Sequence, residues 1–71
     1  MYSGRHIYLL RIIKNLSQQE VASCLGISQQ ALSKWENEKW LDNEKIDQLL
    51  AAIHSSRKEL DSIKNISPKI E

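Results

Sequence analysis

The chain has few of the residues on which several kinds of protein site depend. Its 71 residues include one cysteine, two glycines and two histidines. The single Cys24 excludes an intrachain disulfide and a cysteine-based metal site, and His6 and His54 are too far apart in the sequence to suggest a ligand pair. We find no nucleophile with its base, no paired-carboxylate site and no glycine-rich phosphate loop. We therefore expect neither an enzyme nor a metal or cofactor.

Long hydrophobic runs are also missing. The sequence has no stretch of about twenty apolar residues and no long apolar run near its start, so we expect neither a membrane span nor a signal peptide. A chain of this length makes one domain with one small core. With the lone cysteine, these features favour a soluble protein in a reduced, cytoplasmic setting.

Neither sign of charge is in large excess. The formal net charge is +1, which is low for a nucleic-acid binder. Residues 1–41 carry five cations and three carboxylates, a net of +2, and residues 42–71 carry five cations and six carboxylates, a net of −1. A nucleic-acid binder of this composition has to rely on directed amide and hydroxyl contacts as well as on cations.

The most informative segment that is present runs from Gln18 to Trp35. Val21 and Leu25 lie four residues apart, and Leu32 and Trp35 lie three apart. Each pair therefore shares one face of a helix. This spacing predicts two short helices whose apolar faces meet.

The residues between these helices suit a tight turn. Ala22 is small enough to allow a close approach, and Gly26 stands where a helix end needs positive φ. Ile27 then fills the turn. A generic helical hairpin is the alternative interpretation, but it does not require these three residues together.

Both helix starts have local capping signals. Ser17 precedes the first helix with Glu20 three residues later, a capping-box pattern, and Ser28 has the same position before the second helix. The beginnings of both helices are therefore specified by neighbouring residues.

Further helices are expected on either side. A first helix over about residues 3–14 turns Ile7 and Leu10 toward the pair, and Leu16 closes the core after a turn at Asn15. After the pair, Asp42 or Asn43 caps a fourth helix. The apolar residues of that helix repeat at helical spacing: Ile46, Leu49, Leu50 and Ile53.

The C-terminal segment predicts a short amphipathic helix that ends before Ser67. Its apolar stripe, Leu60 and Ile63, allows two interpretations. The stripe packs onto its own domain, or it meets the same stripe of a second copy. We favour the second arrangement, a symmetric dimer. We expect residues 67–71 to fray.

These residues carry a resemblance to a known family. The segment LRIIKNLSQQEVASCLGISQQALSKWEN resembles the helix-turn-helix domain of the lambda-type phage repressor and Cro family, also called the XRE family. The resemblance covers about residues 7–53. Glu38 stands where the family usually has glycine, and Asp42 stands where it often has proline.

The resemblance implies a compact all-α, lambda repressor-like domain of four or five helices. Residues 1–54 form the helix-turn-helix DNA-binding domain, and residues 55–71 form the C-terminal helix and tail. The implied function is sequence-specific transcriptional regulation, most readily repression, by a homodimer on double-stranded DNA. The competing interpretation is a protein-interaction module, such as an antitoxin, that binds a protein partner through Leu60 and Ile63.

The second helix of the pair carries the residues expected to contact bases. With Leu32 and Trp35 turned inward, its exposed side includes Gln29, Gln30, Ser33 and Lys34. A glutamine amide can bond an adenine edge in a bidentate manner, and lysine suits guanine O6 and N7. The candidates for phosphate contacts are Gln18, Ser28, Asn37 and Lys39. By resemblance, Gln18 also braces the first recognition glutamine.

Two further expectations concern single positions. The family pairs an arginine of the first helix with the glutamate that ends the recognition helix, and this chain has both, Arg11 and Glu36. We predict a structural salt bridge between them. For Trp40 we favour a role in covering the core edge over contact with a partner or with the DNA backbone.

Overall fold

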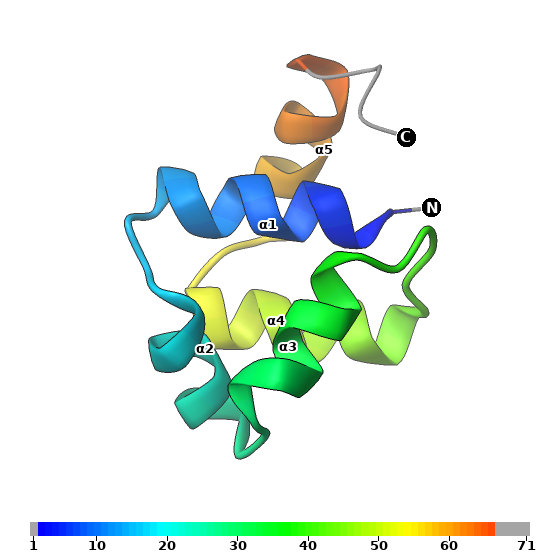
Figure 1. Ribbon diagram of the computed structural model, residues 1–71. Helices are drawn as coiled ribbons and strands as arrows, with labels where there is room; N and C mark the ends of the chain where they lie inside the picture. Colours follow the sequence, from blue (N-terminus) through cyan, green and yellow to red (C-terminus); the bar gives the residue numbers. More distant parts are fainter. Residues whose placement is uncertain (1, 67–71) are drawn as a thin grey trace.

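Five α-helices account for most of residues 2–66, the part of the chain that the computed structural model describes (Figure 1). The helices are α1 (Gly4–Ile13), α2 (Gln18–Leu25), α3 (Gln29–Glu36), α4 (Asn43–Ile53) and α5 (Arg57–Ile66). No strand occurs within this range, where Tyr2 and Leu41 form an isolated antiparallel bridge. The all-α prediction is confirmed. Residues 67–71, which we expected to fray, lie outside the described residues.

The helix starts follow the local signals. The Ser17 hydroxyl accepts a hydrogen bond from Glu20 N, and the Glu20 carboxylate accepts one from Ser17 N, each at 3.0 Å. Ser28 and Asp42 each accept one from the backbone N–H three residues later, at 3.0 and 2.8 Å. These bonds satisfy N–H groups that have no partner within the helix. The cap of α4 is therefore Asp42 rather than Asn43.

The turn between α2 and α3 has the expected geometry. Gly26 lies in the left-handed region, with φ of 69°, and Ala22 is buried beneath the approaching helix. Ile27 packs against the core. A residue with a Cβ is disfavoured at the backbone angles of Gly26, so this position favours glycine.

The loop after α3 tolerates the two departures from the family pattern. Glu38 is not among the described residues with positive φ, so its position does not need glycine. Its carbonyl accepts a hydrogen bond from Gly4 N at 2.9 Å, and its carboxylate lies 3.2 Å from Lys45 Nζ. Asp42 replaces proline with a side chain that caps α4.

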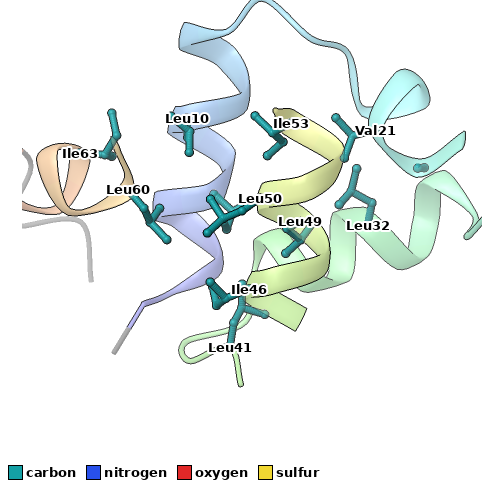
Figure 2. Close-up of a cluster of buried hydrophobic side chains, with 12 residues drawn as sticks. Leu10, Val21, Leu32, Leu41, Ile46, Leu49, Leu50, Ile53, Leu60 and Ile63 are labelled. Atoms are coloured by element: carbon teal, nitrogen blue, oxygen red, sulfur yellow. The ribbon is translucent and has the colours of Figure 1, made fainter. Parts of the chain in front are cut away.

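Every helix contributes to one hydrophobic core (Figure 2). Its buried members are Ile7, Leu10, Val21, Ala22, Leu32, Leu41, Ile46, Leu49, Leu50, Ile53, Leu60 and Ile63. Most of the apolar positions that we expected on α1, α2, α3 and α4 are among them, whereas Leu25 and Trp35 are partly buried and pack against the core. The arrangement places α1 in contact with both α3 and α5, with α5 on the side of α1 away from α2 (Figure 1).

The stripe of α5 lies inside this core. Leu60 is 0 % exposed and Ile63 is 6 % exposed, and both point from α5 toward α1 (Figure 2). The structure therefore has the first of the two arrangements considered, packing onto the chain's own domain. A contact with a second copy, which we favoured, would require both side chains to leave the core. The division at residue 54 stays a prediction, although α5 shares the core of α1.

The N-terminal segment connects α5 to the loop before α4. The Tyr2 hydroxyl donates a hydrogen bond to Asp61, and Leu41 N donates one to Tyr2 O at 2.9 Å. The bond to Asp61, followed by burial, raises the pKa of the Tyr2 phenol. Tyr2 and Asp61, which are far apart in the sequence, are thus joined at the exposed side of α5.

A close approach of α1 to the end of α3 depends on Gly4. A Cβ at this position would overlap the carbonyl oxygen of Trp35 and lie 2.8 Å from Glu36 Cα. Both groups are backbone and cannot rotate away. Only glycine fits there, and the sequence pattern gave no indication of this.

We expect the substitution Gly4→Ala to lower the free energy of unfolding by about 3 kcal/mol, because the methyl group forces α1 away from α3. Gly26→Ala is the matched control, since nothing lies within 4 Å of its Cβ and only the positive φ is strained, which costs about 1 kcal/mol. Urea unfolding followed by circular dichroism measures both. Equal losses would contradict the close approach.

We expect Leu60→Ala to lower the free energy of unfolding by about 2–5 kcal/mol, because it leaves a cavity between α5 and α1. The exposed Lys58→Ala should change it by less than about 0.5 kcal/mol. Thermal unfolding at several protein concentrations makes the distinction. A loss that depends on concentration would indicate that Leu60 contributes to a dimer instead.

Candidate nucleic-acid interface

One face of helix α3 packs against the hydrophobic core, and the opposite face is exposed to solvent. Leu32 is fully buried, and Trp35 packs partly buried against the core. On the other face, Gln29, Gln30 and Lys34 are exposed. This face lies on the outside of the domain, where α3 crosses in front of α4 (Figure 1). It has the size and polarity of a helix that enters a major groove.

The side chains expected to contact bases lie on the exposed part of α3. Ser33 is only half-buried, and Lys34 is exposed in the last turn of the helix. Gln29 and Gln30 occupy the N-terminal end, next to the turn with α2. Since eight residues of helix span about 12 Å, all four positions fall within the length of a few base pairs.

The Arg11 and Glu36 side chains meet in the interior between α1 and α3. Arg11 Nε lies 2.6 Å from Glu36 Oε2, and Arg11 Nη2 lies 3.2 Å from Oε1. The two side chains are only 7 % and 3 % exposed. The remaining Arg11 Nη1 donates to the carbonyl of Leu16 at 2.9 Å. This two-point geometry is the strong form of such a pair, and it joins α1 to the end of α3.

Gln18 connects this ion pair to the exposed face. Its Nε2 donates to Glu36 Oε1 at 2.9 Å, and its Oε1 accepts a hydrogen bond from Gln29 Nε2 at 3.4 Å. Bracing of Gln29 by Gln18 was implied by the family resemblance. The bond from Gln18 to Glu36 was not predicted, because no periodic signal relates residues 18 positions apart.

The expected phosphate contacts lie at both ends of α3. The Ser28 hydroxyl oxygen accepts the capping bond, which leaves its hydrogen for a donor contact. The Asn37 amide already donates to Ser33 O at 2.8 Å, so one of its two hydrogens remains. Lys39 is exposed in the following loop. Gln18, Ser28, Asn37 and Lys39 therefore do not form one cluster, but flank the helix as contacts to a DNA backbone would.

Trp40 does not cover the core, contrary to our expectation. Its exposed fraction is 47 %, and it is not among the side chains packed against the core. Its neighbour Leu41 occupies the buried place, because Leu41 is fixed by the bridge to Tyr2. Successive side chains of extended backbone point in opposite directions, so Trp40 faces outward.

The carboxylate of Glu20 lies in the first turn of α2. The pKa of Glu20 is lowered, first by the hydrogen bond from the backbone of Ser17 and then by that from the Ser17 hydroxyl. The capping box therefore keeps Glu20 ionised where the helix dipole favours a negative charge.

A family model described as helix-turn-helix matches residues 7–60. The chain belongs to the XRE, Cro-type helix-turn-helix family. Membership implies DNA binding, and members of this family are typically non-catalytic. No curated protein and no solved structure matches the chain.

Within residues 2–66 this helix-turn-helix protein has neither a membrane-spanning helix nor a cluster of side chains suited to a metal ion. No described helix is long and apolar enough to cross a membrane. The same residues contain no group of three or more histidine, cysteine, aspartate or glutamate side chains that could hold a metal ion.

In this helix-turn-helix protein we expect Arg11→Met to lower the free energy of unfolding by about 3–5 kcal/mol, because it leaves the buried Glu36 carboxylate without its cation. The double variant Arg11→Met/Glu36→Met should recover most of this loss, since no unpaired charge remains. Urea unfolding of Arg11→Met, Glu36→Met and the double variant gives the coupling free energy between the two side chains. Additive losses would show that the pair does not act as a unit.

Proposed function

We propose that this helix-turn-helix protein is a sequence-specific transcriptional repressor that binds double-stranded DNA as a homodimer. The observation that carries the proposal is the exposed face of α3, where Gln29, Gln30 and Lys34 project from a helix whose other face is fixed in the core. In the proposal α3 enters the major groove, and occupation of the operator represses transcription.

The chemistry of this face suits direct readout. The amides of Gln29 and Gln30 match the N7 acceptor and N6 donor of adenine, and Lys34 donates to guanine O6 and N7. Ser33 contacts a base edge. Gln18, Ser28, Asn37 and Lys39 bind phosphates on either side and set the register of α3 in the groove.

The low net charge fits a protein that depends on these directed contacts. Of the proposed contact residues only Lys34 and Lys39 are cations, so few counterions are released on binding and affinity falls only gently as salt is raised. A homodimer whose half-sites lie about 34–36 Å apart would double the number of contacts and supply the missing affinity. Its dimer surface would exclude the Leu60 stripe, which the core already uses.

The alternative is a module that binds a protein partner through Leu60 and Ile63. In the folded domain these two side chains are not exposed for such a partner. Both side chains are buried against α1, so a charged substitution there would unfold the domain whether or not a partner exists.

Selection of bound sequences from random DNA duplexes tests the proposal. The native protein should enrich one motif with two-fold symmetry. Gln29→Ala/Gln30→Ala should lose about tenfold to a hundredfold of base preference at the corresponding positions, because each bidentate amide contact contributes about 1–3 kcal/mol.

Gln48→Ala is the matched control, because Gln48 is an exposed glutamine on α4. This variant should enrich the native motif. Absence of any motif for the native protein would refute the proposed function, and a motif without two-fold symmetry would refute the dimer.

A further inference from the structure

A continuous chain of hydrogen bonds runs from the interior of the domain to the recognition face. It begins at the buried Arg11 and Glu36 pair, passes through the amide of Gln18 at 2.9 Å and ends at the amide of Gln29 at 3.4 Å. The three elements α1, α2 and α3 each contribute to it. Through these hydrogen bonds, the position of Gln29 depends on Glu36, whose side chain is only 3 % exposed.

The buried end of this chain has a fixed polarity. An ionised carboxylate only accepts hydrogen bonds, and Glu36 accepts two from Arg11 and one from Gln18. A reversed Gln18 amide would place its oxygen against the carboxylate, two acceptors in contact at a partly buried site. Gln18 therefore turns Nε2 inward and Oε1 outward.

The amide of Gln29 is oriented in the same way by the bond that it makes to Gln18. Gln18 Oε1 accepts from Gln29 Nε2, and a reversed Gln29 amide would again bring two oxygens together. Nε2 of Gln29 therefore lies on the side of Gln18. The amide has two N–H groups and one oxygen, so one N–H and Oε1 remain for a base, in a defined spatial order.

We propose that Glu36 is a positioning residue for base recognition: acting through Gln18, it fixes the order of donor and acceptor that Gln29 presents to the major groove. The inference rests on the proposed function, in which Gln29 contacts a base. One donor followed by one acceptor matches N7 and N6 of adenine. Guanine offers two acceptors, and the exchanged T·A pair presents its groups in a different order. Without the carboxylate the amide of Gln29 is free to reverse, and the discrimination is lost.

The test compares base preference at one position of the operator. Random-duplex selection with Gln29→Ala first identifies the base pair that Gln29 contacts. Competition binding then measures the preference for adenine there in the native protein and in Arg11→Met/Glu36→Met, which removes the carboxylate without leaving a buried charge. We expect at least a tenfold preference in the native protein and no more than about twofold in the double variant, while the preference at the Gln30 position is unchanged.

Two further variants make the result specific. Lys14→Met/Glu59→Met removes an ion pair of 3.0 Å that joins α1 to α5 and has no link to Gln18, so it should keep the native preference. Gln18→Met interrupts the chain and leaves the Arg11 and Glu36 pair in place. It should lose the same preference and, in addition, bind all sequences more weakly, because a proposed phosphate contact is gone.

The outcomes separate the inference from the proposed function. If the native protein selects a motif and the folded Arg11→Met/Glu36→Met protein keeps its preference at the Gln29 position, the role of Glu36 is refuted alone. If that variant does not fold, an unchanged preference in Gln18→Met refutes it equally. If the native protein selects no motif, the proposed function has failed, and the inference fails with it.

Discussion

The structure depends most on the two-point contact between Arg11 and Glu36, because it joins a helix that does not contact bases to the one expected to do so. Removing both charges from water is costly, and the geometry compensates with bonds at 2.6 and 3.2 Å. The neighbouring Leu16 carbonyl and Gln18 amide occupy further donor and acceptor sites of the pair. The close approach at Gly4 lies beside this pair, so α1 can hold α3 in one position.

Much of the fold was predictable because its determinants are local. The caps at Ser17, Ser28 and Asp42 involve residues three positions apart. Gly26 suits the positive φ that the turn has at that residue. Apolar periodicity then indicates which face of each helix is buried. The pairing of Arg11 with Glu36 came from the family resemblance, since nothing local in the sequence relates residues 25 positions apart.

The remaining features depend on distances between elements, which periodicity does not contain. The stripe of Leu60 and Ile63 defines an apolar face but not what covers it, and the core of the same chain does so. The outward position of Trp40 follows from a bridge that fixes its neighbour to Tyr2. In the candidate site, the polar face of α3 was visible in the sequence, whereas the bond from Gln18 to Glu36 was not, because it requires α2 and α3 to be packed first.

The low net charge bears on the role of the Arg11 and Glu36 pair in the proposed DNA binding. A strongly basic binder gains affinity from phosphates of any sequence, but the interface proposed for this domain has only two cations, Lys34 and Lys39, and gains less in this way. In the proposed function, discrimination comes from a few amides, and a flexible glutamine loses conformational entropy when it binds. In the proposal, Gln29 is already held by Gln18, whose amide is oriented by the buried, acceptor-only Glu36, so Gln29 loses less entropy and presents one arrangement of donors and acceptors. A buried ion pair adds little net stability compared with apolar packing, so its value in this domain lies in the orientation that it imposes on the recognition helix.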